Sequence, residues 1–219
     1  MPLSVEDALK KMNANRLVHK EKGDFGEQAI IAIVRSYQEL AGGTIIHSFR
    51  YPYATNRQNV PYPGNIHLDN GDFVEVKSKM ALQDEIDVVY ITKYRIFSIE
   101  CKARGGTWRL ENKWCSQNGR PVDKSPLAQA EKHVRHLYHS IYEYLPDGNP
   151  NYIIPLTVFV DKARVLDSRN DQQKVYIPIA IADILKQRIK DCDSPLKYSL
   201  DTEGILAKML KIGKGTVFK

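Results

Sequence analysis

Two neighbouring apolar runs near the middle of the chain constrain its fold more than any other feature. Residues 86–91 and 96–103 are rich in β-branched and other apolar side chains, and the short polar stretch 92–95 separates them. Such a pattern predicts a β-hairpin, in which two antiparallel strands are joined by a short turn. The turn lacks an Asn-Gly or Asp-Gly pair, so the prediction depends on the apolar runs rather than on the turn.

The length of the turn decides which residues face each other. We assume a loop with an even number of residues centred on residues 93–94. Asp87 then lies opposite Glu100, and Glu85 falls opposite Lys102. Alternation places Asp87, Glu100 and Lys102 on one face, where opposed side chains are about 5 Å apart at Cβ and like charges destabilise the pair. A divalent cation is the simplest group that would relieve this repulsion, because it is hard and binds oxygen ligands.

The charged face has a structural explanation and a functional one. A strand on a sheet with one wet face carries Asp, Glu and Lys by default. Here, however, the charged face also carries Val89, Ile91 and Ile96, so it is not an ordinary solvated face. The opposite face is apolar and consists of Val88, Tyr90, Phe97, Ile99 and Cys101. The charges are therefore predicted at one end of a strand pair that is mostly buried.

The composition of the chain suits one folded domain with an anionic partner. Its 219 residues are 42% hydrophobic and 26% charged, which is ordinary for a globular protein. No apolar run approaches membrane-spanning length and the N-terminus has no signal-peptide core, so we expect no membrane partner and a cytoplasmic location. Three scattered cysteines predict neither a disulfide framework nor a metal site. The formal net charge of +6 favours a partner such as nucleic acid.

Hydrophobic periodicity predicts the remaining elements. Helices are predicted at residues 4–19, 24–40, 125–145, 184–191 and 202–212, and strands at 44–51, 73–79, 152–160 and 175–181. A further hairpin is predicted around residues 108–114. Residues 213–219 are polar and punctuated by glycine, and no element is predicted there. The apolar stripe of the second helix consists of Ala29, Ile30, Ile33, Val34, Tyr37 and Leu40.

Glu27 lies in the first turn of the helix predicted at residues 24–40. Ile30, Ile31 and Val34 follow it by three, four and seven residues, so Glu27 is at the edge of the buried face. Most glutamates in a first helical turn stabilise the helix through its dipole. The functional alternative is a carboxylate that points from the helix end toward the hairpin, and spacing alone does not separate the two.

The helix predicted at residues 125–145 carries polar side chains beside its apolar stripe. Gln129 is close to the helix start and would hydrogen-bond at a site there. His133, His136 and His139 spread over about 120° of the helix surface, which argues against a metal site built from them. We expect these histidines to be solvated or to contact phosphate.

A second Glu-x-Lys spacing occurs at Glu75 and Lys77, in the strand predicted at residues 73–79. Its alternation suits a half-exposed edge strand, and no acidic strand precedes it at hairpin distance. We therefore assign the chemistry to Glu100 and Lys102 instead.

Four ordered patches of sequence resemble the nuclease-related domain (NERD) group of the PD-(D/E)XK nuclease superfamily. They are Lys22-Gly23-x-x-Gly26-Glu27, Asp87 followed by Glu100-Cys101-Lys102, Gly106-Thr107-Trp108, and Ser125-Pro126-Leu127-x-Gln129-Ala130, where the family commonly has Asn first. The likeness covers roughly residues 20–165. The proline of the superfamily's name is missing before Asp87, a loss that the superfamily tolerates, and the region 44–79 is longer than the short connection expected.

The resemblance implies an α/β (α+β) fold with a restriction-endonuclease-like core, in which a mixed β-sheet is flanked by helices. It also implies metal-dependent cleavage of phosphodiester bonds. Carried over residue by residue, Asp87 and Glu100 would hold Mg²⁺, for which Mn²⁺ would substitute. Glu27 would be an added acidic ligand or would position water. Lys102 would orient the attacking water and stabilise charge on the phosphate, and Gln129 would support the site.

The predicted organisation has an N-terminal helical extension (1–22), a nuclease-like core (23–165) and a C-terminal part (166–219) that completes the same domain. The first functional hypothesis is an endonuclease that acts on DNA in preference to RNA, and cleavage of both strands would favour a homodimer. The second is a catalytically silent nucleic-acid-binding module that kept the fold. A third is a binding protein that uses the basic and aromatic loop 50–62, with a purely structural hairpin.

Overall fold

The computed structural model describes residues 25–52, 64–67, 73–76, 83–103, 105–111, 115–122, 125–160, 163–167, 175–176 and 181–219. The helix predicted at residues 4–19, most of the basic and aromatic loop, and Lys77 lie outside the described residues. Within the described ranges, no helix has the length and apolar character needed to cross a membrane.

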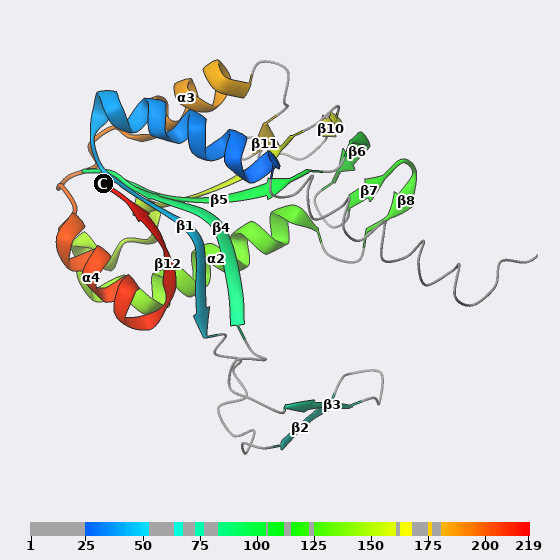
Figure 1. The fold of residues 1–219 in the computed structure, drawn as a ribbon, viewed down its shortest axis with the longest axis horizontal. Coiled ribbons are helices and arrows are strands. Elements are labelled where there is room, and N and C mark those ends of the chain that lie inside the picture. Colours follow the sequence, from blue (N-terminus) through cyan, green and yellow to red (C-terminus); the bar gives the residue numbers. More distant parts are fainter. Residues whose placement is uncertain are drawn as a thin grey trace, which may run out of the picture.

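A six-stranded mixed sheet forms the centre of the molecule (Figure 1), in the order β11-β9-β5-β4-β1-β12. Its strands are β1 (Thr44–Pro52), β4 (Gln83–Ile91), β5 (Ile96–Lys102), β9 (Ile153–Phe159), β11 (Val175–Tyr176) and β12 (Lys214–Phe218). The pairs β5–β9 and β9–β11 are parallel, and the other three pairs are antiparallel. The prediction of a mixed α/β fold is confirmed.

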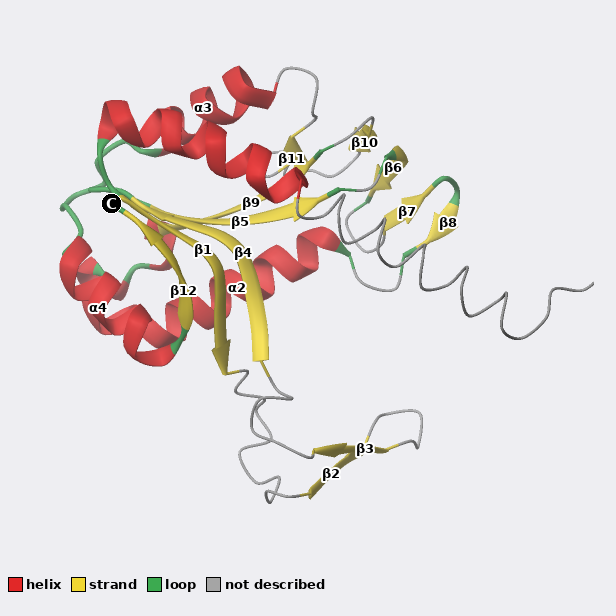
Figure 2. Ribbon diagram, viewed as in Figure 1, coloured by secondary structure: helices red, strands yellow, loops and turns green. Residues whose placement is uncertain are grey.

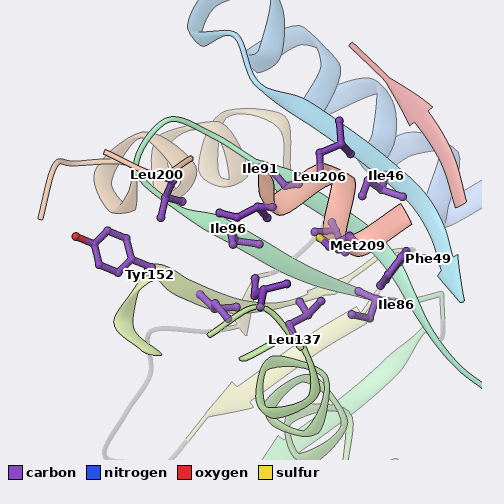
Figure 3. Packing of buried hydrophobic residues seen from close by; sticks show 14 of the residues in the cluster. Ile46, Phe49, Ile86, Ile91, Ile96, Leu137, Tyr152, Leu200, Leu206 and Met209 are labelled. Carbon is purple, nitrogen blue, oxygen red and sulfur yellow. The ribbon is translucent and has the colours of Figure 1, made fainter. Parts of the chain in front are cut away.

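Helices cover both faces of this sheet (Figure 2). The helix over residues 25–41 and α3 (Ile181–Cys192) lie on one face, and α2 (Pro126–Ile141) and α4 (Thr202–Ile212) lie on the other. Each pair of helices closes its own apolar core against the sheet, and Figure 3 shows the one beneath α2 and α4. Three short 3₁₀ turns follow α2, at Tyr142–Tyr144, Pro146–Gly148 and Pro150–Tyr152.

Two smaller sheets complete the described structure. One has the order β10-β6-β7-β8 and consists of β6 (Gly106–Leu110), β7 (Cys115–Gln117), β8 (Arg120–Pro121) and β10 (Ala163–Asp167). It confirms the hairpin predicted around residues 108–114, although its second strand begins at Cys115. The other pairs β2 (Gly64–His67) with β3 (Phe73–Val76), so Glu75 belongs to a sheet separate from the central one.

The central hairpin has the predicted register over the four residue pairs next to its turn. Val88 pairs with Ile99 and Ile91 pairs with Ile96, around the loop 92–95. The two predicted faces are also confirmed, because Val89, Ile91 and Ile96 pack beneath α2 and α4, whereas Val88, Tyr90, Phe97 and Ile99 pack beneath the 25–41 helix and α3.

Three details differ from the prediction. Leu40 is 85% exposed and does not join the apolar stripe of the 25–41 helix, whereas Ile31 is buried there. Residues 214–218 form strand β12, which the glycine-rich sequence did not suggest. The strand predicted at residues 152–160 contains Pro155, and a proline needs an edge strand or a bulge, but β9 lies between β5 and β11. The proline is accommodated because β11 pairs only with Thr157 and Val158, beyond Pro155.

Candidate active site where strands β4 and β5 separate

The ladder between β4 and β5 ends at the pair Val88–Ile99. Beyond this point β4 continues beside β1, and Glu85 pairs with Arg50 instead of lying opposite Lys102. The residues of β5 that follow pair only with β9. The predicted pairings of Asp87 with Glu100 and of Glu85 with Lys102 are therefore wrong, because the two strands of the hairpin separate before reaching these residues.

A local change of alternation accompanies this separation. Ser48 has a positive φ of 51°, and Ile46 and Phe49 on either side of it face the same apolar core. In β4, Ile86 and Val89 are also three residues apart and face this same core, and Asp87 lies between them in the sequence. A strand that alternates regularly would place such residues on opposite faces. Strands β1 and β4 bend away from β5 together (Figure 1). The change of alternation lies at Ser48 in β1 and at Asp87 in β4.

Asp87 uses its carboxylate to satisfy the backbone of the neighbouring strand. The N–H of Cys101 donates to Oδ2 of Asp87 over 2.6 Å, at the place where β5 has lost β4 as a partner. Burial and the nearby charge of Glu100 raise the pKa of Asp87 well above its usual range, and Glu27 adds to this effect. A partly buried carboxylate beside another acid is the electrostatic situation that a bound cation relieves.

Glu100 and Lys102 lie on the face covered by α2, as alternation predicted. Glu100 is buried, and its Oε1 accepts a short hydrogen bond from Nζ of Lys102. The same Nζ donates to Oε1 of Gln129 over 3.2 Å. Gln129 lies in the first turn of α2, which begins with Pro126 at a position where a missing N–H costs nothing. The structure therefore brings Glu100, Lys102 and Gln129 together from β5 and α2.

His133 lies one helical turn after Gln129, and its environment differs from the prediction. It was expected to be solvated or to contact phosphate, but it is fully buried. Its Nδ1 is 3.3 Å from Oε2 of Glu100, and its Nε2 is 3.5 Å from Oδ1 of Asp84, whose other oxygen pairs with Lys132. Burial opposes the charged imidazolium, but the two carboxylates outweigh it and raise the pKa of His133 to about 9.

The other two histidines of α2 differ from His133 in burial. His139 is exposed, and His136 is half-buried with its ring centroid 5.7 Å from that of Tyr51. Tyr51 itself is buried against Phe49, and Arg50 pairs with Glu85 over 2.7 Å. Arg50 and Tyr51 of the basic and aromatic loop are thus occupied in ion pairing and packing, respectively.

Glu27 approaches the site from the opposite face of the sheet. Its Oε2 is 3.2 Å from Nε2 of His47 in β1. The helix start can come this close to β5 because residue 26 is glycine: a Cβ there would lie 2.5 Å from Val160 and 3.0 Å from the Cys101 sulfur. The resemblance to the nuclease-related domain placed Gly26 beside Glu27, and this close approach is its physical reason.

The donor set suits a cation that needs few protein ligands. Within the described residues, no group of three or more His, Cys, Asp or Glu side chains is arranged to hold a metal ion. Oε2 of Glu100 is buried and makes no hydrogen bond of good geometry within the described chain. Asp87 and Glu100 together offer hard oxygen ligands, which fits Mg²⁺, since this ion usually binds one or two carboxylates and keeps several waters.

The sequence missed three residues of this arrangement: His133, Asp84 and His47. The spacing of Gln129 and His133 was a usable signal, because residues four apart lie on one face of a helix. Asp84 and His47 carried no such signal, since their contacts depend on how β1, β4 and α2 meet. Cys101 packs with the apolar core, where burial raises the pKa of its thiol well above the usual range.

Comparison with known families supports an assignment of the chain. A family model described as nuclease-related domain matches residues 22–160, a span that includes the 25–41 helix, β4, β5 and α2. Comparisons with curated proteins and with solved structures found no match. The matched region covers more than half of the 219 residues and contains all the residues that the candidate site brings together. The chain is therefore a member of the nuclease-related domain family.

Proposed function

We propose that this protein is a metal-dependent nuclease that hydrolyses phosphodiester bonds, as an endonuclease and in DNA rather than RNA. The observation that supports this most strongly is the convergence of Asp87, Glu100, Lys102 and Gln129 at the point where β4 leaves β5. A buried carboxylate, a partly buried one and a lysine at the end of a sheet are costly to keep together unless their charges are used.

Asp87 and Glu100 are the proposed ligands of Mg²⁺, with Mn²⁺ as a substitute. When bound, the ion would activate water and neutralise charge that develops on the phosphate. Glu27 remains a candidate for an added ligand or for holding a water, and its partner His47 would orient it. The raised pKa of Asp87, caused by burial and by Glu100, agrees with a carboxylate whose charge a cation would stabilise.

Lys102 is the proposed cationic side chain of the site, and its charge would add to that of the metal ion. A lysine ammonium has three N–H donors, and two of them go to Glu100 and Gln129 within the described chain. The third donor would orient the attacking water or bind a phosphate oxygen. Gln129 accepts from Lys102 and so holds the ammonium in place from α2.

The test is cleavage of supercoiled plasmid by the purified chain with Mg²⁺, with Mn²⁺ and with EDTA. We expect nicking or linearisation that requires metal and that falls by at least about 10²-fold in Lys102→Ala, because removal of one preorganised donor at a developing charge has effects of this size. The matched control is Lys208→Ala, which also removes a lysine paired with a glutamate, but on the exposed surface of α4. This control should cleave like the wild type.

A second candidate is a catalytically silent module that binds nucleic acid. Two observations favour it: Lys102 is already paired with Glu100, and three metal-binding side chains are not gathered in the described chain. Nucleic-acid binding without cleavage of plasmid, of single-stranded and branched DNA, or of RNA under any metal condition would support this module and contradict the nuclease. Metal-dependent cleavage that survives Lys102→Ala would contradict the proposed site.

A further inference from the structure

His133 is a fully buried, polar side chain with carboxylates on two sides. Its Nδ1 lies 3.3 Å from Oε2 of Glu100 in β5, and its Nε2 lies 3.5 Å from Oδ1 of Asp84 in β4. Oε2 of Glu100 makes no hydrogen bond of good geometry within the described chain, so the imidazole is the polar group at hand to hold it. A buried polar atom that is left without a partner is costly, which favours this contact.

The two carboxylates belong to strands that are no longer connected to each other at this point. The last pair between β4 and β5 is Val88–Ile99, and Asp84 and Glu100 both lie beyond it. His133, which belongs to α2, therefore contacts both strands where they are no longer paired with each other. Lys132 forms an ion pair with the other oxygen of Asp84 over 2.7 Å and so holds the Asp84 carboxylate in place.

We propose that His133 is a positioning residue: its bridge between Asp84 and Glu100 holds the Glu100 carboxylate in place relative to Asp87. This inference rests on the proposed function, since Glu100 and Asp87 are the proposed metal ligands. Groups that hold a ligating carboxylate typically change metal affinity or activity by 10–100-fold when they are removed. In this arrangement α2 supports two residues of the site from successive turns, Lys102 through Gln129 and Glu100 through His133.

The test is the affinity of the intact chain for Mn²⁺ without nucleic acid, measured by titration calorimetry or by electron paramagnetic resonance. His133→Leu is expected to weaken the Kd by about 10–100-fold. His133→Asn, whose amide nitrogen replaces Nδ1, should recover part of the loss. The matched control is His139→Leu, an exposed histidine of the same helix, and it should leave the Kd unchanged.

Kinetics and a double-mutant cycle separate positioning from a general structural effect. On plasmid DNA, His133→Leu should lower kcat and leave KM unchanged, because the buried ring does not reach the substrate. Asp84→Asn should weaken Mn²⁺ binding in the wild-type background but add little in His133→Leu, because Asp84 acts through His133.

The outcomes distinguish this inference from the proposed function. An unchanged Kd for Mn²⁺ in a folded His133→Leu, or additive effects of His133→Leu and Asp84→Asn, would overturn the inference alone, provided that Glu100→Gln still abolishes binding. If His133→Leu does not fold, His133→Asn and Asp84→Asn carry the same test. If the wild type shows no binding that depends on Glu100, the proposed metal site is wrong and the inference falls with it.

Discussion

Asp87 combines a structural hydrogen bond with a charge that the fold does not favour. Its carboxylate accepts from the Cys101 N–H, while burial and Glu100 raise its pKa. Because a raised pKa means that the folded state binds the proton more tightly, the ionised carboxylate lowers stability as pH rises above its unfolded value of about 4. The residue is therefore expected to favour function over stability.

Replacement of this residue should separate the two effects. Asp87→Asn keeps an oxygen that accepts from Cys101 and removes the charge, so we expect loss of metal-dependent cleavage with retained or tighter DNA binding. In EDTA at neutral pH, the same variant should unfold at a higher temperature than the wild type. The matched control is Asp147→Asn, at an exposed position, which should change neither quantity. Cleavage at the wild-type rate by Asp87→Asn would remove Asp87 from the site.

The ion pairs around Asp84 give a pH dependence with a definite sign. Although burial would raise it, the partners His133 and Lys132 hold the pKa of Asp84 well below its usual range, so its contribution is present above about pH 4 and lost as pH falls further. The raised pKa of His133 contributes stability below about pH 6.5, and this is lost as pH rises through about 9.

Asp84→Asn should consequently cost the most stability between about pH 4 and 6.5. Urea denaturation in EDTA at pH 5.5 and at pH 9.5 checks this, and the difference from the wild type should be smaller at pH 9.5. An equal difference at both pH values would mean that His133 does not interact with Asp84 as the structure indicates.

At the scale of elements, the kink shared by β1 and β4 separates β4 from β5. Ser48 adopts a positive φ, a conformation that costs roughly 1–2 kcal/mol for a residue with a Cβ. Ser48→Gly is therefore expected to leave the free energy of unfolding unchanged or raise it by about that amount. Ser48→Val should lower it by about 1–3 kcal/mol, because β-branched residues are true outliers at positive φ.

Denaturant unfolding of the two Ser48 variants measures this difference, and plasmid cleavage shows whether the kink also serves the site. The Ser48 hydroxyl lies 3.2 Å from Nε2 of His47, so Ser48→Ala, which keeps the Cβ, serves as a control for loss of that contact alone. Equal stabilities of Ser48→Gly and Ser48→Val would show that the backbone at residue 48 is not held at positive φ.

At the scale of the whole molecule, the end of the chain completes the central sheet. Strand β12 pairs with β1, and Gly215 lies so close to it that a Cβ would be 2.6 Å from Ile46 and 2.9 Å from the His47 carbonyl. Gly215→Ala should lower the free energy of unfolding by about 1–3 kcal/mol, the usual cost of overpacking. Thr216→Ala, at the exposed neighbouring position, should cost less.

Thermal and urea unfolding of these two variants provide the measurement. A Gly215→Ala variant as stable as the wild type would indicate that β12 does not pack closely on β1. Because β1 also carries Ser48 and His47, a displaced β12 is expected to reduce plasmid cleavage together with stability.

The central hairpin, its register next to the turn and its two faces could be predicted from the sequence. These features follow from interactions between residues close in the chain, namely the turn length and the alternation of side chains along a strand. The same alternation placed Glu100 and Lys102 on one face, and helical spacing put Gln129 near the start of α2. The family was also apparent from the order of these short patches, and their catalytic roles stay predictions.

The way in which these pieces meet could not be predicted from the sequence and is seen in the folded molecule. The separation of β4 from β5 at Asp87, the burial of His133 between Asp84 and Glu100, and the pairing of β12 with β1 all depend on contacts between distant segments. Local periodicity holds no information about such contacts, because a kink or a close approach at glycine changes which side chains meet without changing the pattern around it. The geometry of the candidate site belongs to this second class.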